Sequence, residues 1–373
     1  MADQLAAWLR LTLLPGIGPA QQRTLLAAFG LPQHVFDSGR SAIAGVIGAQ
    51  AADRLLAPPD EARIRGALDW AAQPGNHLIT LADAEYPRTL LEIPDPPVVL
   101  YVKGDPALLQ SPGLAVVGAR SATPGGCANA EAFAEALAGA GLTIISGLAL
   151  GIDAAAHHGA LQAPDGRTVA VIGTGADRVY PARHQKLAHQ IVTHGAIVSE
   201  FPLGTPALPH NFPRRNRLIA GLARGVLVVE AAVGSGSLIT ARLATECGRE
   251  VFAIPGSIHS PLARGCHRLI RDGAKLVETA SDVLEELAWG NPGQRHPQPE
   301  TARSHGTTSA SRAAPAPSPE HARVLDALGH DPLDIDTLAG RCGLTLDALY
   351  AILLSLELDG QVGKVPGGRF QRL

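Results

Sequence analysis

Aromatic residues, cysteines and long apolar runs are all scarce in this sequence of 373 residues. Aromatic residues make up 4% of the chain although hydrophobic residues make up 46%, so the core must be mainly aliphatic, which is typical of α/β proteins. The four cysteines are scattered without a Cys-x-x-Cys pair, which argues against a disulfide framework or a zinc site. No apolar run approaches the roughly 20 residues of a membrane span, and no basic region of a signal peptide begins the sequence. We therefore expect a cytoplasmic protein that has no membrane partner.

A strong net charge is missing as well. The formal net charge is −3 at pH 7, and the pI is about 6.5. These values exclude a globally basic nucleic-acid binder, but they leave room for a local basic patch. The sequence also lacks a Gly-x-x-x-x-Gly-Lys-[Ser/Thr] motif, which excludes a P-loop NTPase.

The pattern of the sequence changes along the chain, which is long enough for two or three domains. Residues 1–75 have the pattern of short helices, and their LLPGIGPAQQ stretch is similar to a helix-hairpin-helix turn, although a plain Gly-Pro turn explains it equally well. Residues 76–289 alternate β-rich and helical runs. Residues 290–319 are rich in Pro, Ser, Thr and Ala, which predicts a flexible linker. Residues 320–373 contain three helical segments and a glycine-turned hairpin, the order of a winged helix.

The strand runs of the central segment are continuously apolar rather than alternating, as in LAVVG, LTIIS, TVAVIG and GVLVVE. Such strands are buried on both faces, so helices must cover both sides of the sheet. We therefore expect an α/β fold with an extended Rossmann-like, doubly wound parallel sheet. An N-terminal helical domain of the SAM or helix-hairpin-helix kind and a C-terminal winged-helix domain flank it.

Small residues follow nearly every predicted strand. These positions are Gly118, Ser146–Gly147, Gly173–Gly175, Gly204 and Ser235–Gly236–Ser237. The ends of parallel strands gather at one edge of the sheet, where ligands bind, and glycine lets the backbone approach phosphate closely. This pattern favours an anionic ligand at that edge.

Three kinds of phosphate ligand are possible: a dinucleotide, a small nucleotide or a nucleic-acid strand. The Gly-x-Gly-x-x-Gly fingerprint of dinucleotide sites fails, because Ala119–Arg120 stands where the second glycine belongs. Rossmann-like nucleotide phosphoribohydrolases carry a glutamate in a late glycine loop, and Leu243 takes that place here. That enzyme remains the alternative function, although it would lack its acid. We predict no catalytic residue and no cofactor.

The stretch PHNFPRRNRLIAGLARG, residues 209–225, concentrates arginines beside Phe212. Arginine neutralises phosphates, and an aromatic ring can stack on an unpaired base. The arginines can equally well pair with acidic residues such as Glu200, Glu230 or Asp153, and the sequence leaves both alternatives open.

Two further features, a helical segment of the winged helix and a group of histidines, do not predict the duplex-DNA site or metal site that each could suggest. The longest helical segment of the winged helix, TLDALYAILLSLELDG, has no Lys or Arg, which favours a protein-interaction or weakly binding module over a reader of duplex DNA. The histidines at 157, 158, 184, 189 and 194 lack the spacing and acidic or Cys partners of a metal site, so no metal is predicted.

Six ordered blocks resemble the DNA-processing protein A family (DprA, also called Smf). They are VVGARSATPGG, SGLALGIDAAAHHGAL, VAVIGTGADRVYP, FPRRNRLIAGLARGVLVVEAAVGSGSLITARLA, GREVFAIPGS and GCHRLIRDGAKLV, within residues 80–285. The resemblance implies a homodimeric single-stranded DNA-binding protein, not an enzyme, that protects incoming DNA and loads the recombinase RecA during natural transformation.

The resemblance also implies which residues act. Ala182 stands where the family often has a lysine, so Arg183 or Lys186 is expected to replace that contact. The expected nucleic-acid contacts are Gly118, Arg120, Ser121, Arg183, Lys186, Phe212, Arg214, Arg215, Asn216 and Arg217. His267 and Leu276 match dimer positions, and Thr245 and Arg271 lie where RecA contact is expected.

Overall fold

The computed structural model describes residues 2–289, 319–329, 332–365 and 367–372. It divides into two compact units, one of residues 1–122 with 130–280 and one of residues 123–129 with 281–373. The predicted linker at 290–319 lies outside the described residues, except for its last residue.

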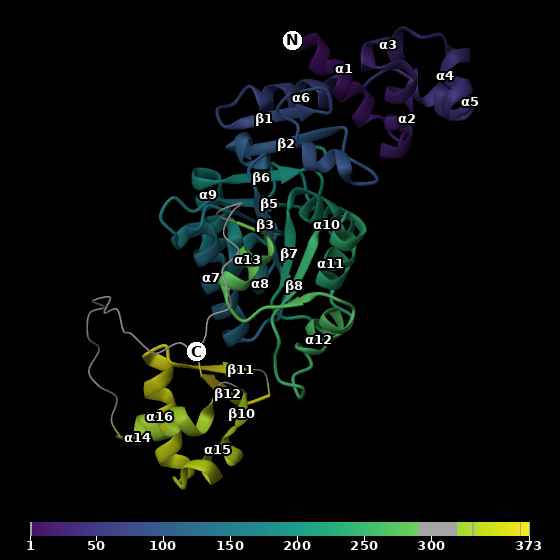
Figure 1. Ribbon diagram of the computed structural model, residues 1–373. Coiled ribbons are helices and arrows are strands. Elements are labelled where there is room, and N and C mark those ends of the chain that lie inside the picture. Colours follow the sequence, from purple (N-terminus) through teal and green to yellow (C-terminus); the bar gives the residue numbers. More distant parts are fainter. Residues whose placement is uncertain (1, 290–318, 330–331, 366, 373) are drawn as a thin grey trace. The chain divides into compact units, whose positions relative to one another are not determined.

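Six helices begin the first unit (Figure 1). They are α1 (Ala2–Leu13), α2 (Pro19–Phe29), α3 (Pro32–Asp37), α4 (Arg40–Ile47), α5 (Ala49–Leu55) and α6 (Glu61–Ala71). Leu25, Ile43 and Leu55 are among the residues that form a core within these helices. Trp8 and Trp70 belong instead to a cluster that includes residues of the sheet. The helices therefore pack onto the sheet and share part of its core.

A nine-stranded sheet forms the centre of the first unit. Its strands are β1 (Asn76–Thr80), β2 (Val99–Gly104), β3 (Gly113–Val117), β4 (Thr143–Ser146), β5 (Thr168–Val171), β6 (Ala196–Ser199), β7 (Gly225–Val228), β8 (Glu250–Ala253) and β9 (Lys275–Leu276). The order is β1-β2-β6-β5-β4-β3-β7-β8-β9. Strands β3 to β9 pair in parallel, whereas β2 is antiparallel to both β1 and β6. The predicted doubly wound sheet is confirmed, with an antiparallel extension at one end.

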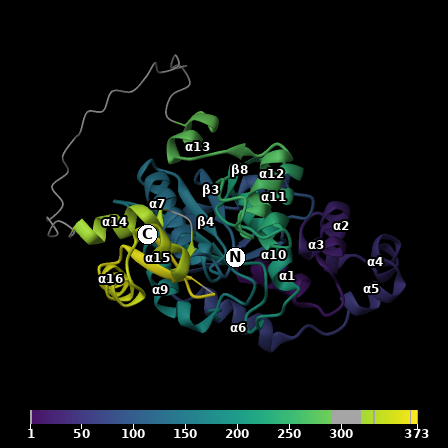
Figure 2. The ribbon, with the colours of Figure 1, turned by 90° about the horizontal axis from the view of Figure 1, so that it is seen from below.

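Helices cover both faces of the sheet, as Figures 1 and 2 show, with α7, α8 and α9 on one face and α10, α11 and α12 on the other. Their bounds are α7 (Pro124–Gly139), α8 (Ile152–Gln162), α9 (Gln185–His194), α10 (Asn211–Leu222), α11 (Gly236–Glu246) and α12 (Arg264–Arg271). Three short 3-10 helices are η1 (Arg88–Glu92), η2 (Pro106–Leu109) and η3 (Ala182–His184). Because both faces are covered, the strands from β3 to β7 are buried throughout.

The second unit contains the predicted winged helix. Its elements are α13 (Ala280–Glu286), α14 (Pro319–Leu328), β10 (Leu333–Asp334), α15 (Ile335–Cys342), α16 (Leu346–Leu358), β11 (Val362–Val365) and β12 (Arg369–Arg372). The three strands pair in the order β10-β12-β11. Leu349 and Leu353 of α16 pack with Phe370 of β12 in one hydrophobic cluster. The other side of α16 leaves Tyr350 and Leu354 more than half exposed.

Among the described residues, no single helix is long and apolar enough to cross a membrane. Only α15 and α16 taken together reach that length and apolarity, and they are bent by 104° at their junction.

Candidate nucleic-acid interface

The strands β3 to β7 all end at one edge of the sheet, which we call the crest. Along the chain, strands β3, β4, β5 and β6 lie side by side in one direction across the sheet, and β7 then lies on the other side of β3. This reversal is a topological switch point, where open α/β sheets bind ligands. The small-residue loops predicted from the sequence therefore do gather along one edge, at which Gly118, Gly147 and Gly173 each lie just beyond a strand.

Three side chains on the crest form what we call the crest cluster: Arg120, Tyr180 and Phe212. The Arg120 guanidinium carbon lies 5.4 Å from the centre of the Phe212 ring, and the centre of the Tyr180 ring lies 5.6 Å from it, tilted by 44°. Arg120 is exposed, Tyr180 is 50% exposed and Phe212 is half-buried. The cluster thus presents a cation and a half-exposed aromatic ring to solvent.

The start of α10 holds Phe212 in place. The buried side chain of Asn211 donates to the carbonyl oxygen of Gly173 over 3.0 Å, which ties the helix to the loop after β5. Gly173 also leaves room for the ring, since a Cβ at this position would lie 3.1 Å from Phe212. The Phe212 ring is therefore fixed in position by contacts with the loop after β5.

Arg215 does not face solvent, contrary to the prediction that it contacts a bound strand. It is 4% exposed, and its Nη1 donates to the carbonyl oxygens of Gly147, over 2.6 Å, and of Val171. Burial lowers the pKa of its guanidinium to about 10. The guanidinium occupies the space that a side chain at Gly147 would need, which explains the glycine. Arg215 therefore links the loop after β4 to the last residue of β5 by hydrogen bonds made inside the protein.

A buried carboxylate accompanies this arginine. Asp153 is 6% exposed and accepts from the backbone N–H groups of Gly147 and Ala149 over 3.1 and 3.3 Å. Burial raises the pKa of its carboxyl, whereas the charge of Arg215 acts in the opposite direction. Asp153 and Arg215 thus hold the same loop, one through its N–H groups and one through a carbonyl oxygen.

Two other arginines pair with Glu200, the alternative that the sequence had left open. Glu200 Oε2 lies 2.8 Å from Arg214 and 2.5 Å from Arg217, and the Glu200 side chain is 2% exposed. Arg217, which the sequence predicted as a nucleic-acid contact, is 8% exposed and also lies 3.1 Å from Asp95, so its guanidinium already has two acidic partners. Arg214 remains 39% exposed and keeps part of its guanidinium available.

The remaining predicted contacts lie on or beside the crest. Ser121 is exposed in the loop after β3, and Arg183 and Lys186 are exposed on η3 and α9. A ring nitrogen of His184 lies 3.0 Å from the carbonyl oxygen of Leu148. This contact brings the segment that contains Arg183 and Lys186 next to the loop after β4. The Asn216 side chain accepts from Arg215 and donates to the carbonyl oxygen of Gly236.

The four predicted dimer or partner residues lie near the other end of the sheet, on α11, α12 and β9. Leu276 is 50% exposed on the edge strand β9, and Arg271 is exposed at the end of α12. Thr245 is exposed on α11, and a ring nitrogen of His267 lies 2.9 Å from the carbonyl oxygen of Gly256. They occupy a different part of the unit from the crest cluster.

One of the five histidines belongs to the core. His157 is completely buried, and its Nδ1 lies 2.7 Å from the hydroxyl of Thr168. Burial is the main reason that its pKa is lowered to about 3. In the part of the chain that the structure describes, no three His, Cys, Asp or Glu side chains come together as a metal site would require.

Tyr180 was not predicted from the sequence, whereas Glu200 and Asp153 were named only as possible partners of the arginines. Tyr180 had a usable signal: it is one of only four tyrosines and follows the glycine loop after β5. For Glu200 and Asp153, the sequence did not indicate which arginine each would accompany.

Comparisons with known proteins agree with this architecture. The family model of DNA recombination-mediator protein A matches residues 77–288, and that of the DprA winged helix domain matches residues 308–368. Protein Smf of Escherichia coli is 44% identical over 85% of this chain and 83% of its own length.

Two solved structures are also similar. The X-ray structure of DNA processing protein A from Streptococcus pneumoniae is 40% identical, with a TM-score of 0.68 over 75% of this chain and 97% of that chain. DNA processing protein A from Helicobacter pylori, described with its single-stranded DNA binding mode, is 30% identical, with a TM-score of 0.52 over 57% of this chain and 95% of that chain. Since the first family model covers more than half of this sequence and the Escherichia coli relative most of it, the chain belongs to the DNA recombination-mediator protein A family, also called DprA or Smf.

Proposed function

We propose that this chain binds single-stranded DNA along the crest. The crest cluster is the observation that carries the proposal. Arg120 offers a cation for a backbone phosphate, and the Tyr180 ring offers a face on which an unpaired base can stack. Double-stranded DNA does not present unpaired bases in this way, so the arrangement favours a single strand. The described binding mode of the Helicobacter pylori relative supports the same ligand class.

The remaining residues divide into contacts and supports. Ser121, Arg183, Lys186 and the exposed part of Arg214 extend the contact surface on either side of the cluster. Arg215, with Asp153, positions the loops after β4 and β5 and does not touch the strand. Arg217 has the corresponding role beside Glu200. Gly118 allows the backbone after β3 to pass close to the backbone after β7, because a Cβ there would lie 2.9 Å from the carbonyl oxygen of Glu230.

The biological part of the proposal is that the bound strand is protected and passed to RecA during natural transformation. The exposed surface of Thr245, His267, Arg271 and Leu276 is the proposed place for a second copy of the chain and for RecA. We propose cytoplasmic action without a cofactor or catalysed reaction. Leu243, which stands where a phosphoribohydrolase would carry its glutamate, packs against the hydrophobic core, which gives the enzyme alternative no support.

The test is the salt dependence of binding by an Arg120→Ala variant. Each lost phosphate contact should lower the slope of log K against log salt by about 0.7 for a single strand. The matched control is Arg167→Ala, because Arg167 is also exposed but precedes β5 at the opposite edge of the sheet. Fluorescence anisotropy with single-stranded and duplex DNA at several salt concentrations measures the effect. An unchanged slope for Arg120→Ala, or binding to duplex alone, would contradict the proposal.

A further inference from the structure

The exposed apolar side chains of the first unit concentrate at the crest. Among the described residues of this unit, the large apolar side chains that are exposed are Leu31, Leu91, Tyr180, Leu208, Val233, Ile258 and Leu276. Four of these seven lie in loops that follow neighbouring parallel strands, namely β5, β6, β7 and β8. Strand β8 pairs in parallel with β7 and therefore ends at the same edge. Single exposed apolar side chains are ordinary, but several of them along one edge indicate a contact surface.

Hydrogen bonds join the loops after β7 and β8 to each other and to the loop that carries Arg120. The N–H group of Ala231, after β7, donates to the carbonyl oxygen of Leu262, after β8, over 2.7 Å. The N–H group of Ala119, after β3, donates to the carbonyl oxygen of Glu230 over 2.7 Å. The three loops therefore form one hydrogen-bonded framework, and the apolar side chains after β7 and β8 are held beside the crest cluster.

The surface of these two loops is apolar and carries no exposed acid. Val233 is 54% exposed and Ile258 is 74% exposed. The exposed residues of the loops are Val233, Gly234, Gly256, Ile258, His259 and Pro261, and the acid next to them, Glu230, is half-buried. Arg264 is exposed at the start of α12, directly after the second loop, and has no ion pair within the part of the chain that the structure describes. This side of the crest thus combines apolar side chains with an unpaired cation.

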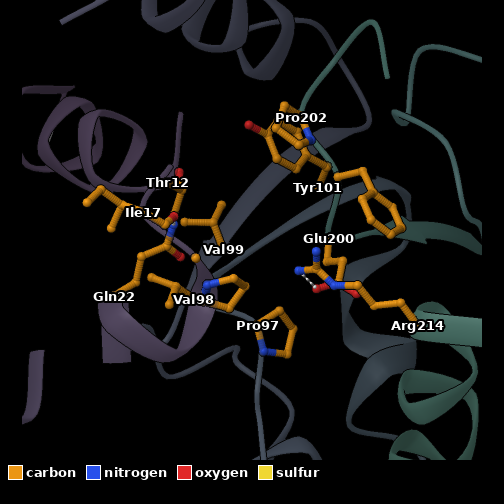
Figure 3. Close-up of a pocket in the computed structure, with 13 residues that line it drawn as sticks. Thr12, Ile17, Gln22, Pro97, Val98, Val99, Tyr101, Glu200, Pro202 and Arg214 are labelled. Atoms are coloured by element: carbon orange, nitrogen blue, oxygen red, sulfur yellow. Dashed lines mark hydrogen bonds and ion pairs between the residues drawn. The ribbon is translucent and has the colours of Figure 1, made fainter. Parts of the chain in front are cut away.

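The other side of the crest cluster, beyond β6, is different. Figure 3 shows Glu200 beside Arg214 there, in the wall of a pocket of about 240 Å³. Glu200 already neutralises Arg214 and Arg217, at 2.8 and 2.5 Å. The apolar side chain on this side, Leu208, is only 37% exposed. A nucleic-acid strand therefore finds more apolar surface and a freer cation, Arg264, on the side of β7 and β8.

The order of the strands sets the length of strand that could bind here. From β5, which precedes Tyr180, to β8, which precedes Ile258, the sheet passes through β4, β3 and β7. With neighbouring strands about 4.8 Å apart, these four steps span roughly 19 Å. Bases stacked about 3.4 Å apart cover that distance in roughly five or six nucleotides. One short stretch of a single strand can therefore contact Tyr180, Arg120 and Ile258 together.

We propose that Val233 and Ile258 form a second base-contact site, and that the bound single strand continues from the crest cluster over the ends of β7 and β8. The proposal rests on the proposed function and adds the course of the strand to it. The faces of nucleobases are apolar, and aliphatic side chains pack against them in other DNA-binding proteins. Arg264 supplies a cation for a phosphate of the same stretch. Because an aliphatic side chain does not hydrogen-bond to base edges, this site accepts any base.

Serine at each position tests the contact. Val233→Ser and Ile258→Ser should each weaken the binding of a single strand of about 12 nucleotides roughly three- to tenfold, because covering part of an apolar side chain contributes a fraction of full burial. The slope of log K against log salt should not change, since neither substitution removes a charge, whereas Arg264→Ala should lower it by about 0.7. Fluorescence anisotropy at several salt concentrations measures both quantities.

The matched controls are exposed leucines elsewhere in the chain. Leu91→Ser corresponds to Val233→Ser, because Leu91 is also 54% exposed. It lies on η1, whose Glu92 pairs with Arg249 just before β8, at the edge opposite the crest. Leu358→Ser corresponds to Ile258→Ser, because Leu358 is 82% exposed and lies on α16. Both controls should bind like the wild type, and thermal unfolding checks that every variant keeps its fold.

A gain of affinity tests the same contact in the opposite direction. An aromatic ring stacks on a base better than an aliphatic side chain does, so Ile258→Phe should tighten binding roughly threefold, whereas Leu91→Phe should not. A gain of this kind does not result from a damaged fold. In addition, a photoreactive p-benzoylphenylalanine in place of Ile258 should crosslink to the bound strand, and the same group in place of Leu91 should not.

Three results would overturn this proposal. The first is wild-type affinity for both serine variants, and the second is equal crosslinking from positions 258 and 91. The third is a loss of affinity that accompanies a lower molar mass in light scattering, since the two loops would then bind a second copy of the chain. None of these touches the proposed function, which fails if Arg120→Ala leaves the salt slope unchanged.

Discussion

Replacing Tyr180 by leucine removes the most exposed aromatic face of the crest cluster while keeping apolar bulk. Stacking on an aromatic side chain contributes about 1–3 kcal/mol per base, which corresponds to roughly a 5- to 150-fold loss of affinity. The ring is 50% exposed and touches Phe212 in a tilted pair, so the variant should lose at most about 1 kcal/mol of folding stability. The effect on binding should therefore exceed the effect on folding.

The assay is anisotropy titration with single-stranded DNA at several salt concentrations. Stacking releases no counterions, so Tyr180→Leu should lower affinity without changing the salt slope, whereas Arg120→Ala changes the slope. Tyr180→Phe keeps the aromatic face and should bind like the wild type. Tyr350→Leu is the matched control, because Tyr350 is 52% exposed but lies on α16. Wild-type affinity for Tyr180→Leu, or a slope reduced as far as in Arg120→Ala, would refute stacking at this residue.

Two further predictions concern stability. Arg215→Met removes the hydrogen bonds to Gly147 and Val171 and leaves Asp153 buried without its cation, so unfolding by urea should show a loss of about 3–5 kcal/mol; a loss below about 1 kcal/mol would mean that this arginine does not support the loops. His157 has a folded-state pKa of about 3, below the ordinary value of 6.5, so the folded state binds fewer protons than the unfolded one, and stability is lost as pH falls below 6.5. Between pH 7 and pH 5 this group should cost about 2 kcal/mol. In His157→Gln the decline should be shallower by that amount, and a decline as steep as that of the wild type would show that His157 is not the group responsible.

The eight strands from β2 to β9 could be predicted because each is a short apolar run between helical segments. Strand β1 could not, because its sequence NHLIT begins and ends with polar residues and pairs only with β2. Asn76 and Thr80 are buried all the same, since the N-terminal helices cover this end of the sheet. Local pattern thus predicts strands inside the parallel sheet better than those at its margin.

The location of the candidate site could also be predicted, since the ends of parallel strands gather at one edge of a sheet. The exposure of each arginine could not. The partners of Arg215 lie 68 and 44 residues away in the sequence, and Glu200 lies 14 residues before Arg214 and 17 before Arg217. Four similar arginines close together in a sequence, at 214, 215, 217 and 224, carry no sign of which will be buried. That difference arises only when distant loops supply carbonyl oxygens or a carboxylate.

The antiparallel extension of the sheet gives the crest two unlike ends. At one end it is bordered by β2 and the N-terminal helices, and at the other end the sheet stops at the two-residue edge strand β9. A nucleic-acid strand is itself directional, with a 5′ and a 3′ end. Its two possible orientations along the crest therefore place different chemical groups against the helices, and they must differ in free energy. If the crest binds a single strand as we propose, we therefore expect one direction of that strand to be preferred whatever its sequence.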